Sequence, residues 1–348
     1  MNKSDNLKNE ILVISKTLST IVNDIKHLGL MSGKMGYCIY FYHASIFAKE
    51  KQYNVIADQL LDSICKEADE KISLDIPFGL AGIGLGIDYL IKRRYVEGNI
   101  NDVLEKIDIP VFNMISFKSN QLPVDFRIKI QLLYYCYVRL QCQKDKSDGC
   151  FIFEHIIFKL LNSIIQFSSE LWEEPYSFSL RYQLPFFLYI LGLLSTINTF
   201  RDKIRKMTDE ITHYVISQIP VSHAHRLYLI WGMSYPVKEF NLSSWEKHIQ
   251  LLKREIDVTH ILNNEFEDKN IFLEEGISGV LLLLILYNDS VNNEDKIKYD
   301  VTPFINKIAS SATWMRLKND IDFLKMNSGL NGFCGISLII NYIKEINL

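Results

Sequence analysis

Ser32-Gly33-Lys34-Met35-Gly36 runs directly into the apolar stretch 37–47, and the same Gly-x-x-Gly phrase recurs three times along the chain. The later copies, each also followed by an apolar stretch, are Phe78-Gly79-Leu80-Ala81-Gly82, Glu275-Gly276-Ile277-Ser278-Gly279 and Ser328-Gly329-Leu330-Asn331-Gly332. The first two copies are 46 residues apart and the last two 53 apart. The gap between the inner copies is about four further steps of the same size, so the period predicts a stacked or closed repeat architecture.

The segments between the apolar stretches are amphipathic, among them residues 245–262 and 304–317. In residues 55–68, apolar side chains recur every three or four positions and acidic side chains occupy the remaining arc. An apolar helix must be enclosed by other helices, and an amphipathic helix must cover it. We therefore predict an all-α fold, an α/α toroid in which about fourteen helices form a double-layer barrel of seven helix-pair repeats. We expect residues 1–348 to form one domain whose two ends meet.

The composition excludes several classes of protein. Hydrophobic residues make up 48% of the chain and charged residues 23%, as in folded domains and unlike disordered chains. The net charge is −3 and the basic residues are scattered, so no nucleic-acid partner is expected. The six cysteines form no Cys-x-x-Cys pair, which favours reduced thiols in a cytosolic protein.

Membrane and export signals are weak. Residues 1–10 are polar and mixed in charge, unlike the apolar core of a signal peptide. The strongest apolar runs, 184–197 and 277–287, are shorter than the roughly 20 residues that a membrane span needs. We expect no membrane span and a cytoplasmic location.

The three middle repeats must be found without their glycines. The period places them at residues 122–128, 179–186 and 230–237, which lead into or lie within apolar stretches. At the four glycine turns, we expect glycine to permit unusual backbone angles and close approach of neighbouring segments. The free N–H groups at the starts of the apolar helices would then line a central cavity.

With these motifs, the chain resembles the lanthionine synthetase C-like proteins along essentially its whole length. That family consists of seven-repeat α/α toroids, and its glycine signature matches Gly33/Gly36, Gly79/Gly82, Gly276/Gly279 and Gly329/Gly332. Its fourth repeat reads Gly-Leu-Ala-His-Gly-x-Pro-Gly, of which residues 179–186 keep Leu180 and Pro185. Its fifth reads Trp-Cys-x-Gly-x-Pro-Gly, of which residues 231–237 keep Trp231 and Pro236.

The resemblance implies a zinc-dependent peptide cyclase whose chemistry this chain lacks. In the family, the fifth-repeat Cys and a sixth-repeat Cys-His pair bind zinc, which activates a peptide thiol for addition to a dehydrated Ser or Thr. The matching positions hold Gly232, Glu274 and Glu275, and these suit a zinc site of that kind poorly. The family's fourth-repeat His matches Tyr182, a poor base, and its third-repeat Asp matches Asp125. We therefore assign no catalytic residue, metal or cofactor.

Six residues are candidates for the rim of the cavity, which we call the candidate rim: Asp125, Arg181, Tyr182, Trp231, Glu274 and Glu275. Glu274 and Glu275 with His223 or His225 would offer ligands for a new metal site. We favour the alternative that the histidines belong to a helix start after Pro220 and the glutamates to another helix start, where acids suit the helix dipole. Asp125 with Glu274 or Glu275 would offer a carboxylate pair, as in toroidal glycosidases.

Two classes of function follow. The first is a zinc-less, non-cyclising homologue in the maturation of a ribosomally synthesised peptide of lanthipeptide type. Its partner would be a precursor peptide or a peptide-modifying enzyme, held by the cavity. The second is an enzyme with a re-equipped, carboxylate-based cavity, a glycosidase-like hydrolase or a lyase.

Overall fold

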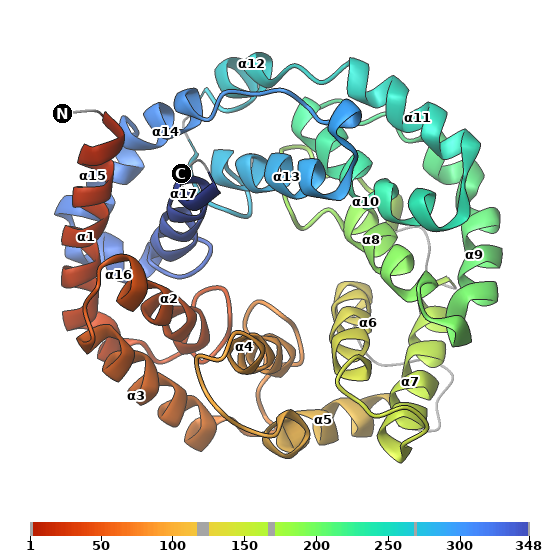
Figure 1. Ribbon diagram of the computed structural model, residues 1–348, viewed down its shortest axis with the longest axis horizontal. Coiled ribbons are helices and arrows are strands. Elements are labelled where there is room, and N and C mark those ends of the chain that lie inside the picture. Colours follow the sequence, from red (N-terminus) through yellow and green to blue (C-terminus); the bar gives the residue numbers. More distant parts are fainter. Residues whose placement is uncertain (1–2, 117–124, 166–170, 268–269, 347–348) are drawn as a thin grey trace. The chain divides into compact units, whose positions relative to one another are not determined.

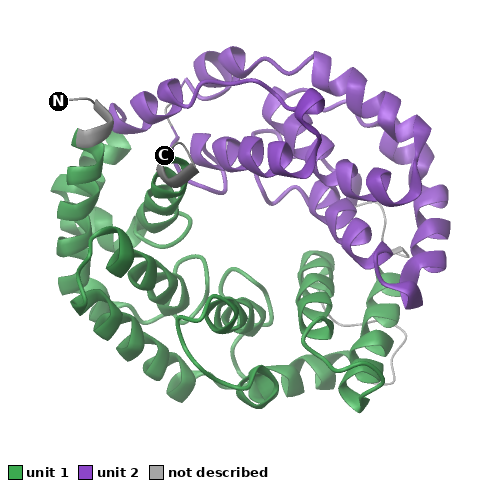
Figure 2. Ribbon diagram, in the orientation of Figure 1, with its two compact units in different colours: residues 1–166, 312–348 green, residues 167–311 purple. Residues whose placement is uncertain are grey.

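The computed structural model describes residues 3–116, 125–165, 171–267 and 270–346. Within these ranges the chain forms seventeen α-helices, a few short 3-10 or π-helical turns and no strand (Figure 1). The all-α prediction is confirmed for this part of the chain. The chain divides into two compact units, Met1–Gln166 with Ala312–Leu348 (unit 1) and Phe167–Ser311 (unit 2) (Figure 2).

Unit 1 pairs each apolar helix with the amphipathic helix that follows it. The apolar helices α2 (Lys34–Phe47), α4 (Leu80–Lys92) and α6 (Phe126–Leu140) pack on α3 (Gln52–Glu67), α5 (Ile100–Ser116) and α7 (Asp148–Ile165), respectively. Helix α2 also contacts α4, and α4 contacts α6, so the apolar helices form one layer and their partners a second. In α3 the buried residues are Tyr53, Ala57, Leu60 and Ile64, which lie on one face of the helix.

The last segment of unit 1 packs on its first. Helices α15 (Ala312–Asn319) and α16 (Ile321–Asn327) contact α1 (Lys3–Ile21), and α17 (Phe333–Ile346) contacts α2. The Tyr37 and Ser328 hydroxyls are 2.8 Å apart, and the Trp314 indole N–H donates to Glu10 across 2.9 Å. Within unit 1, the described helices near the two ends of the chain therefore pack together, in agreement with the expectation.

Unit 2 repeats the same pairing. Helices α8 (Gln183–Ser195), α10 (His223–Phe240) and α13 (Ile277–Ser290) pack side by side, α8 on α10 and α10 on α13. They are covered in turn by α9 (Asn198–Ser217), α11 (Ser243–Arg254) and α14 (Thr302–Ala309). The short helix α12 (Val258–His260) continues into a π-helical turn, Ile261–Glu265, that also packs on α10.

Three more helices form in the described part than the expected fourteen, because two amphipathic stretches are interrupted and a further short helix, α16, precedes the last glycine turn. Stretch 245–262 ends as α11 at Arg254 and restarts at α12, where the Asp257 side chain accepts the backbone N–H groups of Thr259 and His260. Stretch 304–317 is divided between α14 and α15. A side-chain cap of this kind satisfies the free N–H groups of a new helix start.

The glycine turns work through close approach and not through unusual backbone angles. Gly33, Gly79 and Gly276 directly precede α2, α4 and α13, and their backbones are extended. The second glycine of each turn faces the preceding loop: a Cβ on Gly82 would lie 1.8 Å from the Ile76 carbonyl oxygen. No glycine in the described part has a positive φ, so this part of our interpretation is wrong. Before α17, the helix begins only after both glycines, at Phe333.

The fifth repeat departs from the expected register. The predicted turn at 230–237 lies inside α10, which begins at His223. The expected starts at 122–128 and 179–186 agree with α6 and α8, although residues 122–124 lie outside the described part. No described helix is both long and apolar enough for a membrane span. A single domain over residues 1–348 stays a prediction.

Candidate functional site

Arg181, Glu274 and Glu275 lie together at the starts of α8 and α13 in unit 2. The Arg181 guanidinium lies 2.8 Å from the Glu274 carboxylate, and the backbone N–H of Leu180 donates to the Glu274 carbonyl across 2.8 Å. The hydrogen bond and the charge of Glu274 raise the pKa of Arg181, and the charge of Glu275 adds a smaller effect. Glu274 is buried in this pair, while Glu275 is exposed. The pair joins the loop before α8 to the loop before α13, and the Glu274 carboxylate is occupied by this contact.

Tyr182 is a core residue and not part of an accessible rim. Only 1% of it is exposed, and its ring packs against His225 and Tyr228 with centroids 5.4 Å and 6.5 Å away. Burial raises the pKa of its hydroxyl, which has no hydrogen-bond partner among the described residues. This side chain therefore cannot accept a proton at neutral pH, and a substrate cannot reach it.

Trp231 is also buried, because it lies inside α10 and not at a helix start. Its indole stacks between Tyr189 and Tyr228, with centroids 4.6 Å and 5.7 Å away. Gly232 follows it at the contact with α8, where an added Cβ would lie 2.2 Å from the Pro185 carbonyl oxygen. Helix packing accounts for the glycine, and the same contact leaves no room for a cysteine.

Asp125 lies in unit 1, where it caps α6. Its carboxylate accepts the backbone N–H of Arg127 across 2.7 Å. Arg181, Glu274 and Glu275 all belong to unit 2. A carboxylate pair between Asp125 and either glutamate stays a prediction.

His225 is fully buried and uses both ring nitrogens. Its Nε2 accepts the backbone N–H of Ser179 across 3.0 Å, and its Nδ1 lies 2.8 Å from the Glu174 carboxylate. Because a backbone amide can only donate, the ring proton must be on Nδ1. The suggested metal site with His225 and Glu274 is not formed, since His225 bonds Glu174 and Glu274 bonds Arg181. Sequence reasoning missed Glu174, which lies in a polar loop without a motif.

A second group near the start of α10 has the composition of a metal site. Ligand atoms of His223, His260 and Glu265 all lie within 4.8 Å of one another, and two histidines with a carboxylate occur at zinc centres. Glu265, however, accepts hydrogen bonds from Ser222 Oγ and from the backbone N–H groups of His223 and Ala224. It therefore acts as a distant cap of α10.

The histidines of this group also have a structural role and are not arranged as metal ligands. His223 Nδ1 accepts the backbone N–H of Asp257 across 2.9 Å, so its lone pair is taken and the neutral ring carries its proton on Nε2. Metal-binding histidines instead donate their second nitrogen to an acceptor. The two imidazoles stack 4.5 Å apart, and burial lowers the pKa of His223. Of this group, only His223 was named from the sequence as a possible metal ligand, and no motif links it to His260 and Glu265.

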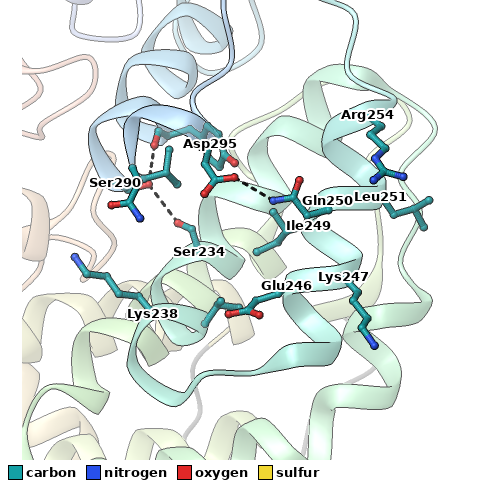
Figure 3. Close-up of a pocket in the computed structure, with 14 residues that line it drawn as sticks. Ser234, Lys238, Glu246, Lys247, Ile249, Gln250, Leu251, Arg254, Ser290 and Asp295 are labelled. Carbon is teal, nitrogen blue, oxygen red and sulfur yellow. Dashed lines mark hydrogen bonds between the residues drawn. The ribbon is translucent and has the colours of Figure 1, made fainter.

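A cleft of about 870 Å³ opens elsewhere in unit 2, between α10, α11 and the end of α13 (Figure 3). Its polar lining includes Ser234 and Ser290, whose hydroxyl oxygens are 3.3 Å apart. Asp295 lines it too and is bonded by Gln250 and Lys253, each across 3.1 Å. No residue of the candidate rim lines this cleft.

Comparison with known proteins adds no assignment: no protein-family model matches the chain, and neither does any curated protein.

Proposed function

We propose that the chain is a zinc-less, non-cyclising lanthionine synthetase C-like protein that binds a precursor peptide or a peptide-modifying enzyme. It would act in the cytoplasm, in the maturation of a ribosomally synthesised peptide. The supporting observation is the state of the groups at the starts of α8, α10 and α13: Glu274 is paired with Arg181, both nitrogens of His225 are bonded, and Tyr182 is buried. Glu274 and His225 hold loops together and Tyr182 is buried, so none of these three residues is a free acid or base.

We further propose that seven helix pairs close into an α/α toroid. Two observations support this fold. Both units pair a layer of apolar helices with a layer of amphipathic ones, and in unit 1 the C-terminal helices pack on α1 and α2. A repeat array whose last unit packs on its first has no exposed apolar end.

Thioether formation needs an activated thiol, and this chain offers no evident means of activating one. A coordinating metal ion deprotonates a thiol, but Gly232 has no ligand atom and Glu274 is held by Arg181. The chain's own buried thiols are not nucleophiles either, because burial raises the pKa values of Cys38, Cys136 and Cys334. A carboxylate-based hydrolase or lyase has less support, since Asp125 caps a helix.

The metal content of the purified protein tests this proposal. We expect far less than one zinc per chain by elemental analysis after exhaustive dialysis, because the lone pair of His223 Nδ1 and the Glu265 carboxylate are already bonded. One zinc per chain in the native protein, lost in His260→Ala but kept in the matched variant His213→Ala, would show that the His223, His260 and Glu265 group is a metal centre. That result would contradict the zinc-less assignment.

A further inference from the structure

We propose that the cleft between α10, α11 and the end of α13 binds an acidic, partly apolar peptide segment. The proposal rests on the proposed function only in taking a peptide as the ligand. The cleft itself belongs entirely to unit 2 and is separate from the candidate rim.

The charges of the lining favour an anionic ligand. Three cations line the cleft, Lys238 on α10 and Lys247 and Arg254 on α11, and all three are exposed. None of them has an ion-pair partner in the described part of the chain. The acids of the lining do not balance them, because Asp295 is already paired with Lys253 and only Glu246 remains unpaired among the described residues. An excess of positive charge therefore faces solvent at this cleft.

The rest of the lining suits a peptide better than a free anion. Val237, Ile249, Tyr287 and Val291 supply an apolar wall, while Ser234, Gln250, Ser290 and Asn292 supply hydroxyl and amide groups. In Figure 3, Ser234 and Lys238 come from one side of the cleft and Glu246 and Gln250 from the other, with Lys247 and Arg254 at the edge. The cleft has a volume of about 870 Å³, within the range of ligand pockets, and its lining combines this apolar wall with polar and charged groups. A phosphate ion would leave the apolar wall uncovered.

The test uses the full chain and fluorescein-labelled synthetic peptides. One peptide alternates Asp and Glu with Leu and Val, a second carries Asn and Gln in place of the acids, and a third carries Lys. Binding is followed by fluorescence anisotropy at low and high salt, with inorganic phosphate as a separate competitor. The variants are Lys238→Glu, Lys247→Glu and Arg254→Glu. Lys206→Glu, an exposed site on α9 outside the cleft, is the matched control.

We expect the acidic peptide to bind more tightly than the other two peptides. Its binding should weaken as the salt concentration rises. Each charge reversal in the cleft should weaken binding of the acidic peptide about fivefold, and Lys206→Glu should leave this binding unchanged. The substituted residues are all exposed, so we expect each variant to fold as the native chain does, and circular dichroism checks this directly.

Three results would overturn the proposal. If the acidic peptide binds tightly but no cleft variant weakens its binding, the peptide binds elsewhere on the protein. The proposed function would then stay intact. Equal binding of the acidic and neutral peptides would remove the role of the cations. If phosphate binds, the cleft variants weaken its binding and no peptide binds, the cleft is a site for small anions. This result would also count against a peptide-binding function.

Discussion

Replacing Asp108 with alanine should lower the free energy of unfolding by about 3–5 kcal/mol, because the change leaves a buried arginine without its counter-ion. Asp108 accepts hydrogen bonds from Arg139 Nε and Nη2, at 3.1 Å and 2.8 Å, and from the Tyr135 hydroxyl at 2.7 Å. Arg139 is 1% exposed, and its guanidinium lies 5.4 Å from the centre of the Phe153 ring. The pair joins α5 to α6, so its loss should loosen two of the helices that build unit 1.

Urea unfolding followed by circular dichroism measures this effect. The matched control is the double variant Asp108→Leu with Arg139→Met, which replaces the pair by apolar side chains. It should recover most of the lost stability, because such replacements at buried pairs are often neutral or stabilising. Single and double variants that unfold at the same urea concentration as the native chain would show that the pair is exposed to water.

Gly232→Ala should destabilise unit 2 by at least about 2 kcal/mol through overpacking. The added Cβ would lie 2.2 Å from the Pro185 carbonyl oxygen and 2.8 Å from two further Pro185 backbone atoms, so α8 and α10 must move apart. Alanine is otherwise favoured over glycine inside a helix, by about 1 kcal/mol, so a loss of stability has to come from the contact.

Thermal unfolding of Gly232→Ala beside Gly98→Ala makes the comparison direct. Gly98 is exposed, and a Cβ there would come no closer than 3.4 Å to a side chain, so its variant should be nearly neutral. A native-like Gly232→Ala would contradict the packing interpretation and would restore the position as a candidate for a functional side chain.

Several elements were predictable from the sequence because their causes are local. The starts of α2, α4 and α13 follow from glycines that face the preceding loop, and the face of α3 follows from apolar spacing. The start of α10 agrees with the helix start expected after Pro220, but the extent of this helix was not predicted. Pro236 was taken as part of a turn, yet it lies inside the helix, whose start is capped by Ser222 and by the distant Glu265.

The candidate rim as a functional site stays a prediction, but the placement of its residues can be compared with the structure. Arg181, Glu274 and Glu275 come together, but the ion pair joins residues 93 positions apart, and no local pattern specifies such a contact. Tyr182 and Trp231 were expected at an accessible rim, whereas aromatic stacking buries both. The cleft was missed because its lining comes from the late turns of α10, from α11 and from the end of α13, and no single motif links these segments.

The most direct test of the central claim is a ring-closure assay on a dehydrated, cysteine-containing precursor peptide. The peptide is incubated with the protein, free thiols are alkylated, and the products are scored by mass spectrometry. We predict that the peptide binds the protein, and that its rings close no faster with the protein than in the uncatalysed reaction. Closure clearly faster than the uncatalysed reaction, and abolished by Asp125→Ala or Glu274→Ala, would show that the chain is an enzyme and would contradict this account.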